Sequence, residues 1–486
     1  QYLFQPPEGA AVMVLGETLH QQPQGEQWRY VVKTGNRDFA APDFRVLYSQ
    51  GAAKTRRPAD VVVLQRRSGG NAYGWLIELR EDNEVLTARD RDALLHQRLA
   101  QVHEQLRQAS HIRRVQMARL NAQLESLQQQ ADEQRQRGTF TLQDQSEFDA
   151  NSVALQRRFS ALAQQLTHLQ HESQRDTLVL RDVQGEDHII PLAQVVDAWY
   201  PNAMSFGQKL QHFFSQIWQF VSDSPTSGGG ESGAFPAIFG TVLMVLLMSI
   251  IVMPLGVVAA VWLHEYAGRN ALTRLVRIAV VNLAGVPSIV YGVFGLGFFV
   301  WLIGGTLDQL FFSRSLPNPT FGTPGLLWAA LTLALLTLPV VIVATEEGLS
   351  RIPDNLRQGS LALGATQAET LWRVVLPLAV PAMLTGLILA VARAAGETAP
   401  LMLVGVVKMA PELPVDAVFP YLHLDRKFMH LGFQIYDLAF QSPNIDADRP
   451  LLYATALLLV VIILSLNLLA MALRHRLRER YRLMTH

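Results

Sequence analysis

Two opposite charges lie in an otherwise apolar stretch of the C-terminal half of the chain. Arg393 and Glu397 are four residues apart within the apolar run 374–407. Residues at this spacing share one face of a helix, so their side chains can pair. Charges inside a membrane span are costly and usually serve a function, but an ion pair that only locks two helices has the same spacing. Both interpretations remain open on the residues alone.

Patterns for catalysis or metal binding are weak in this chain. It has no cysteine, which excludes disulfides, zinc-thiolate sites and thiol nucleophiles. His423 and His430 lack the spacing and the neighbours of a metal site. No Ser-His-Asp set and no pair of carboxylates stands out. We therefore expect a chain that is not an enzyme and holds neither a metal ion nor a cofactor.

The composition divides the chain into two parts. Hydrophobic residues make up 49% and charged residues 17% of the whole, but residues 1–224 are rich in charged and Gln residues. Beyond residue 235, five apolar runs have about the 20 residues that a bilayer requires. These runs are 236–263, 278–303, 326–344, 374–407 and 451–473. Soluble proteins rarely contain such runs, so we predict a helical, polytopic membrane domain at 234–475 and a tail at 476–486.

Basic residues in alternate loops set the orientation of such a domain, because they stay in the cytoplasm. The segments after the first, third and fifth runs are the basic ones. They hold Arg269, Arg274 and Arg277, then Arg351, Arg357 and Arg373, then Arg474, Arg476, Arg478, Arg480 and Arg482. These segments fall on one side, and by parity everything before residue 236 lies outside. We accordingly expect that a first transmembrane helix preceded Gln1.

One of these cytoplasmic loops has a distinctive sequence. Nine residues separate Gly364 from the run that contains Leu376 and Pro377. Gly364 permits the backbone of a tight turn, and Pro377 is tolerated in the first turn of the next helix. The loop resembles the coupling loop of ABC importer permeases, which reads Glu-Ala-Ala, three residues, Gly, nine residues, and then Leu-Pro. The acidic triplet is replaced here by Gln358, Gly359 and Ser360.

Two longer motifs resemble those of phosphate ABC transporter permeases of the PstA type. Residues 392–401 read ARAAGETAPL, similar to the family's AR-x-x-GETAPL, and residues 286–295 read VPSIVYGVFG, similar to its PSIVYGLFG. Shorter matches, including Ser227–Gly230 and His264–Tyr266, extend the resemblance from Ser227 to Arg474. The chain is identified as a member of this family. That implies the ABC importer permease fold and one half of a phosphate path.

The resemblance also implies partners and a location. A second permease subunit completes the path, two ATPase subunits use ATP and push on the loop at Gly364, and a periplasmic binding protein delivers phosphate. The chain lacks the G-x-x-x-x-G-K-[ST] phosphate loop, so ATP hydrolysis belongs to the partners. The expected place is the bacterial inner membrane, with the N-terminal part in the periplasm.

The resemblance assigns a role in phosphate passage to Arg393 and Glu397, and we add Thr398 and Ser288 to the path. The planar guanidinium of arginine donates two hydrogen bonds to a phosphate and stays charged. Many family members carry a further arginine in the third span, where this chain has Val343. Two alternatives remain: a permease for another oxyanion, such as sulfate or molybdate, or a membrane scaffold or sensor led by the N-terminal part.

The N-terminal part changes its periodicity along the chain. Short runs rich in Val, Tyr, Trp and Leu predict β-strands. They are 12–15, 28–33, 44–48, 61–65 and 73–79, with a hairpin of 178–180 and 188–190 around Gly185. Between them, apolar residues step by three and four, as in a coiled coil. We predict a small β domain at 1–90 and 176–200, with a coiled-coil helical hairpin inserted at 91–175.

Two surfaces of this part are candidates for binding a partner. Acids and bases alternate along the hairpin, which argues against nucleic acid, while docking of a protein stays open. Residues 201–233 hold an interfacial helix and a linker. The helix, Phe206–Val221, carries regularly spaced Leu, Phe, Ile and Trp residues, and we expect it to lie on the membrane surface before the first span.

Overall fold

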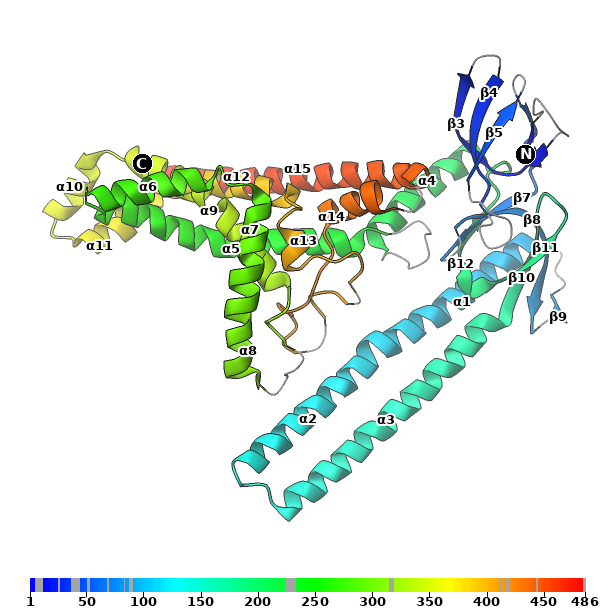
Figure 1. Ribbon diagram of the computed structural model, residues 1–486, viewed down its shortest axis with the longest axis horizontal. Helices are drawn as coiled ribbons and strands as arrows, with labels where there is room; N and C mark the ends of the chain where they lie inside the picture. The colour runs from blue at the N-terminus through cyan, green and yellow to red at the C-terminus, as the bar shows by residue number, and fades with distance from the viewer. Residues whose placement is uncertain are drawn as a thin grey trace. The chain divides into compact units, whose positions relative to one another are not determined.

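A computed structural model provides the fold of the chain (Figure 1). It describes residues 1–486 except 5–11, 25–26, 36–43, 50–52, 68–69, 83, 87–90, 224–232, 269, 314–318, 411, 417–418, 443–444 and 484–486. The chain forms two compact units, Gln1–Gly233 with Ala417–Tyr421, and Ala234–Asp416 with Leu422–His486. Each unit is described by itself. The Ser227–Gly230 motif and most of the predicted linker lie outside the described residues.

The first unit contains three antiparallel sheets. The largest has the strand order β11-β10-β8-β7-β12, with β9 paired to β8, and the smaller sheets have the orders β2-β1-β6 and β3-β4-β5. The strands are β1 (Tyr2–Phe4), β2 (Val12–Val14), β3 (Glu17–Gln24), β4 (Gln27–Lys33), β5 (Phe44–Ser49), β6 (Lys54–Thr55), β7 (Val61–Arg66), β8 (Ala72–Glu81), β9 (Glu84–Val85), β10 (Asp176–Arg181), β11 (Asp187–Pro191) and β12 (Val195–Trp199). Every predicted run is a strand, and Gly185, with φ of +93°, lies in the β10–β11 turn.

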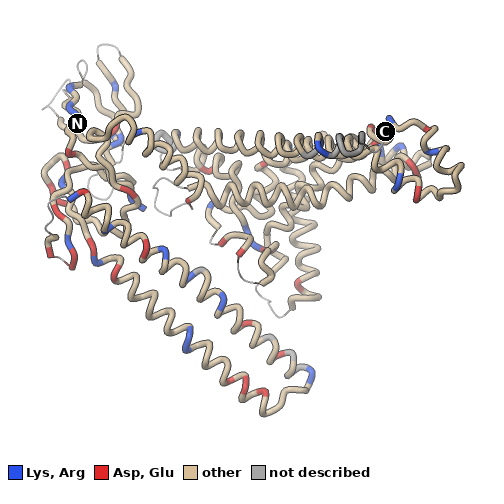
Figure 2. The backbone as a smooth tube through the Cα atoms, turned by 180° about the vertical axis from the view of Figure 1, so that it is seen from behind, with Lys and Arg blue, Asp and Glu red and all other residues tan. Residues whose placement is uncertain are grey.

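A long helical hairpin interrupts the largest sheet. Helix α1 (Arg91–His111) continues through a π-helical turn (Ile112–Met117) into α2 (Ala118–Gln136), and α3 (Leu142–Arg175) returns beside them (Figure 1). Strand β10 then pairs with β8, so the hairpin is an insertion between neighbouring strands. Both acidic and basic residues occur along both arms (Figure 2). Coiled-coil packing of the arms stays a prediction.

Strands β10 and β11 follow the helical hairpin, and after them come a short 3-10 turn (Leu192–Gln194), β12 and one more helix. Helix α4 (Phe206–Ser222) starts at Ser205, whose hydroxyl accepts a hydrogen bond from the Gln208 N–H. The Gln208 side chain in turn accepts one from the Ser205 N–H, which completes a capping box.

The second unit is helical. Its elements are α5 (Phe235–Val261) with a π-helical end (Trp262–Tyr266), α6 (Ala271–Leu283), α7 (Ser288–Phe294), a π-helical segment (Gly295–Gly304), α8 (Gly305–Phe311), α9 (Leu326–Ser350), α10 (Asp354–Ala362), α11 (Gln367–Thr370), a π-helical turn (Leu371–Val375), α12 (Leu376–Gly396), α13 (Leu401–Val404), α14 (Leu431–Tyr436), a π-helical turn (Asp437–Gln441) and α15 (Ile445–Leu483). By length and composition, the described helices contain five candidate membrane spans: 235–266, 288–311, 326–350, 367–396 and 449–476.

The number of candidate spans matches the prediction, but the bounds of the second and fourth spans were wrong. The second span starts at Ser288, because residues 271–283 form the separate helix α6, and Pro287 starts a new helix. The fourth span runs through 367–396, so it begins before residue 374 and ends at Gly396, not at residue 407. Pro377 therefore lies inside this helix and not in its first turn. The break between α12 and α13 falls just before Pro400, which lacks an N–H and disfavours helical backbone at the residue before it.

Helix α9 lies at the centre of this unit and contacts α5 and α12 through small residues. A Cβ atom on Gly256 of α5 would come within 2.5 Å of Val341, and one on Gly348 of α9 within 2.4 Å of the Ala382 Cβ. Glycine therefore lets these helices approach closely, as is common between membrane helices. The resulting core holds α9 against α5 and α12.

Candidate functional site

Many charged residues of the second unit lie at one end of the helical bundle (Figure 2). This end holds α10, α11 and the C-terminal part of α15 (Figure 1). Ion pairs join Arg357 to Glu265 and Arg277 to Glu346, so the segments after the first and third spans meet there. The sequence placed these segments on one side of the membrane, and their contacts agree with that expectation.

The α10–α11 turn (residues 354–370) is a rigid helix–turn–helix. Gly364 has φ of +89°. Its N–H donates to the Leu361 carbonyl, and the Ala365 N–H donates to the Ser360 carbonyl. These two bonds form a Schellman motif, in which the residue after the C-cap adopts left-handed backbone. The glycine predicted for a tight turn thus terminates α10.

The second half of the turn is fixed by side chains. Thr366 and Glu369 make a reciprocal capping box that starts α11. The Ser360 and Thr370 hydroxyls lie 2.9 Å apart and close the turn across its base. At its tip Leu363 is 91% exposed, and Leu356 and Leu361 are exposed as well. The turn is therefore a preformed knob with an apolar tip.

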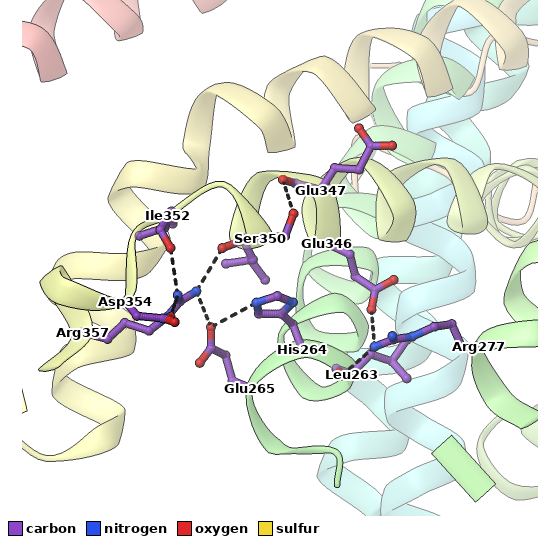
Figure 3. A network of polar contacts seen from close by, with 11 residues as sticks. Leu263, His264, Glu265, Arg277, Glu346, Glu347, Ser350, Ile352, Asp354 and Arg357 are labelled. Carbon is purple, nitrogen blue, oxygen red and sulfur yellow. Dashed lines mark hydrogen bonds and ion pairs between the residues drawn. The ribbon is translucent and has the colours of Figure 1, made fainter. Parts of the chain in front are cut away.

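Arg357 connects this knob to two membrane spans (Figure 3). Its Nη2 donates to Glu265 Oε1 at the end of the first span (3.1 Å) and to the Leu349 carbonyl in the last turn of α9 (2.9 Å). Its Nη1 donates to the Ile352 carbonyl (2.9 Å) and to Asp354 Oδ1 (3.0 Å). The side chain is only 16% exposed. Arg357 therefore links α10 to the ends of both spans.

A second arginine reinforces this connection. Arg277 of α6 pairs with Glu346 of α9 at 3.2 Å and also donates to the Leu263 carbonyl at 3.2 Å (Figure 3). In the sequence, these arginines indicated only the topology of the membrane domain. The His264–Tyr266 motif was the available signal, but nothing in it identifies Arg357 as the partner of Glu265.

The predicted pair of Arg393 and Glu397 does form, at a different place from the one expected. Arg393 Nε lies 3.7 Å from Glu397 Oε1, and both side chains are half-buried. Arg393 is in the last turn of α12, whereas Glu397 has extended backbone just beyond the helix. The two residues therefore do not share a helix face, and they lie at the end of the span away from α10. At 3.7 Å the contact is an ion pair without a hydrogen bond.

The two long motifs of the sequence meet beside this pair. A Cβ atom on Gly292 of α7 would come within 2.7 Å of the Pro400 Cα, and one on Gly432 of α14 within 2.3 Å of the Thr398 Oγ1. Thr398 thus lies where α12, α13 and α14 converge. Ser288 is at the start of α7, and no hydrogen bond or ion pair of the described residues joins it to Arg393, Glu397 or Thr398.

A cavity of about 1,030 Å³ opens between α9 and α12 toward the α10 end. Its wall is mostly apolar and includes Val343, the position where many family members carry arginine. Its charged lining residues are Glu347, Arg351 and Arg474. The Arg393–Glu397 pair is not part of this wall, so the structure contains two separate polar regions along the helices.

His430 is a fully buried histidine at the start of α14, outside the five spans. Burial lowers its pKa from 6.5 to about 4. Its Nδ1 accepts a hydrogen bond from the Gly432 N–H at 3.1 Å, while Nε2 has no partner among the described residues. The neutral ring therefore caps α14 and has no acid beside it that favours its charged form.

We predict that acid destabilises the fold through His430. The unfolded histidine binds a proton below about pH 6.5, but the folded one does so only near pH 4. Stability should therefore fall as the pH drops from 6.5 to 4, by on the order of 3 kcal/mol in total. His430→Asn keeps a cap for α14 and does not titrate. Thermal unfolding in detergent at pH 7 and pH 4.5 should show a smaller shift for this variant, and equal shifts would contradict the prediction.

Part of this chain is similar to known proteins. The family model described as binding-protein-dependent transport system inner membrane component matches residues 252–483. The phosphate transport system permease protein PstA 1 of Mycobacterium tuberculosis is 38% identical over 174 residues, which make up 36% of this chain and 51% of that protein. The chain thus spans about half the length of this relative.

A second relative is covered more fully. The phosphate transport system permease protein PstA of Yersinia pestis is 33% identical over 246 residues, or 50% of this chain and 72% of that protein. The solved inward-facing MetNI methionine ABC transporter is 18% identical with a TM-score of 0.37, and the match covers 50% of this chain and 94% of that one. On the matches to the family model and to the Yersinia pestis protein, the chain belongs to the family of binding-protein-dependent transport system inner membrane components, beside permeases of the PstA type.

Proposed function

We propose that the chain is a transmembrane permease subunit of an ATP-driven phosphate importer. The observation that carries this proposal is the α10–α11 turn, a preformed knob whose apolar tip faces solvent and whose base is bonded to two membrane spans. A partner that binds around Leu363 can move both spans, because Arg357 links α10 to the first and third spans. Phosphate is proposed as the substrate because the similar permeases are named as phosphate transport proteins.

In this proposal the knob lies in the cytoplasm and docks into an ATPase subunit. Two ATPases, a second permease and a periplasmic phosphate-binding protein complete the importer in the inner membrane. The five spans adopt the ABC importer permease fold, the hairpin arms pack as a coiled coil, and the first unit lies in the periplasm. Gln358 stands where the coupling loop of relatives has an acid, so docking relies on apolar contact and shape.

The phosphate ion meets Arg393 at the periplasmic end of the path. The 3.7 Å separation from Glu397 leaves guanidinium N–H groups able to donate to an incoming oxyanion. Glu397 then acts as a competing anion that holds Arg393 in place while the path is empty and limits how tightly phosphate is held. Thr398, at the junction of three helices, offers a hydroxyl beside the same pair.

Uptake of labelled phosphate tests the whole proposal. The chain is co-expressed with the proposed second permease and ATPase subunits. The complex is then reconstituted into liposomes together with the phosphate-binding protein. ATP-dependent uptake that unlabelled phosphate suppresses, and that sulfate and molybdate do not, supports phosphate import. Suppression by sulfate or molybdate would assign another oxyanion. An assembled complex without ATP-dependent uptake of any of the three would refute the proposed function.

Gly364 offers a focused test of the knob. Gly364→Ala should destabilise the turn by about 1 kcal/mol, because alanine disfavours positive φ although space for its Cβ is free. We expect partial loss of phosphate uptake and weaker co-purification with the ATPase. Gly359→Ala is the matched control, since this glycine lies inside α10 and its Cβ would also meet open space. Equal effects of the two variants would show that the turn geometry is unimportant.

A further inference from the structure

Helix α4 presents a broad apolar face that no part of the described chain covers. Six large apolar side chains on it are between 44% and 83% exposed. They are Phe206, Leu210, Phe213, Phe214, Ile217 and Trp218. Their spacing of three and four residues places them on one side of the helix. Such a continuous apolar surface marks an interaction site, because isolated exposed apolar residues are common but patches of this size are not.

The orientation of α4 within its own unit is fixed by its other side. The His212 ring lies 4.6 Å from the Trp199 ring, and its Nδ1 lies 3.9 Å from Asp197 Oδ2 on β12. One turn later, Gln216 Nε2 donates to Gln65 Oε1 on β7 at 3.5 Å. The face that packs on the sheet is therefore polar, and the apolar face is turned away from the protein. This is the reverse of a helix that covers a soluble core.

The end of α4 lies close to the start of a membrane span along the chain. A Cβ atom on Gly233 would come within 2.1 Å of the carbonyl oxygen of Asp223, the C-cap of α4, so these two backbones touch. Helix α5, the first span, begins at Phe235, two residues after Gly233. Two residues reach at most about 7 Å. Chain connectivity therefore keeps the last turn of α4 near the boundary of the bilayer.

We propose that α4 lies in the interface of the bilayer, with this apolar face inserted between lipid headgroups and the β7–β12 edge of the sheet resting above it. Lys209 is the only Lys, Arg, Asp or Glu side chain on α4. Attraction to anionic lipid is therefore small, and burial of apolar area drives the contact. This inference requires only that α5 spans the bilayer and does not depend on phosphate transport.

Spin labels on single cysteines test the inference in the full-length chain, which has no native cysteine. Ile217→Cys places a label in the middle of the apolar face. Ser215→Cys places one on the opposite, exposed side of the same helix and is the matched control. Each labelled chain is reconstituted into phosphatidylcholine bilayers at high lipid-to-protein ratio. Collisions with oxygen, which concentrates in lipid, and with a water-soluble nickel chelate are then measured.

We expect the label at 217 to collide more with oxygen and less with the nickel chelate, and the label at 215 to do the opposite. The contrast should persist at high salt, because apolar burial is not screened. Two results would overturn the inference. Strong collision of both labels with the nickel chelate places α4 in water. A label at 217 that is shielded from both reagents places the face against protein.

Discussion

Arg393→Ala is expected to reduce phosphate uptake on the order of 100-fold while the importer still assembles. Loss of charge-assisted hydrogen bonds to an oxyanion costs about 3 kcal/mol, and each 1.4 kcal/mol corresponds to a factor of ten. Because the Arg393 side chain is only half-buried, we expect its removal to cost little fold stability. Initial rates of labelled phosphate uptake at limiting phosphate, together with co-purification of the ATPase, measure both quantities.

Two further variants separate a role in the path from a structural ion pair. Arg393→Lys keeps the charge but not the planar fork, so it should recover only part of the uptake. Glu397→Gln removes the competing anion and should strengthen phosphate binding while slowing release. If the pair were only structural, both single variants and the double variant would lower thermal stability alike and leave the affinity for phosphate unchanged. Normal uptake by Arg393→Ala would refute the site.

Arg357→Ala is expected to uncouple ATP hydrolysis from transport. The substitution removes four hydrogen bonds at once and leaves Glu265 without its partner on α10. Truncating a partly buried, hydrogen-bonded charge costs about 2–3 kcal/mol, so α10 should lose its fixed position against the first and third spans. The ATPase should keep most of its activity, whereas the number of phosphate ions moved per ATP should fall roughly tenfold.

Arg351→Ala is the matched control for this prediction. Arg351 lies in the same segment, but it is 80% exposed and its ion pair with Glu347 spans 3.7 Å. Exposed pairs of this kind contribute little, so the transport ratio should stay normal. A fall of ATP hydrolysis and uptake in parallel, with loss of thermal stability, would mean that Arg357 serves the fold alone. A normal transport ratio in Arg357→Ala would remove it from the coupling path.

The sequence was sufficient for features that depend on local composition. Apolar length gives five candidate spans because the bilayer imposes about 20 residues, and Gly364 marks a turn for a backbone reason that holds in any fold. Pro377 was expected in the first turn of a helix, but the helix already begins at Gln367 and continues through it. The strand runs at 28–33 and 61–65 were found for the same reason, since their β-branched and aromatic residues are frequent in strands.

Features that depend on tertiary context escaped prediction. Strand β3 (Glu17–Gln24) reads ETLHQQPQ and is mostly exposed, so nothing in its composition indicates a strand, and only pairing with β4 defines it. Glu397 was placed on the helix of Arg393 because its neighbours are apolar, whereas the helix ends at Gly396 and Glu397 has extended backbone. The contact of Arg357 with Glu265 joins residues 92 positions apart, which no spacing rule can reveal.

The helical hairpin of the first unit is long. Helix α3 contains 34 residues, which at 1.5 Å per residue makes it about 51 Å long. Both arms are rooted in the same sheet, since β8 and β10 pair directly where the hairpin leaves and returns. A molecule that touches the tip near Thr139 would therefore be held about the width of a protein domain away from that sheet. The length of the insertion therefore sets how far its tip lies from the sheet.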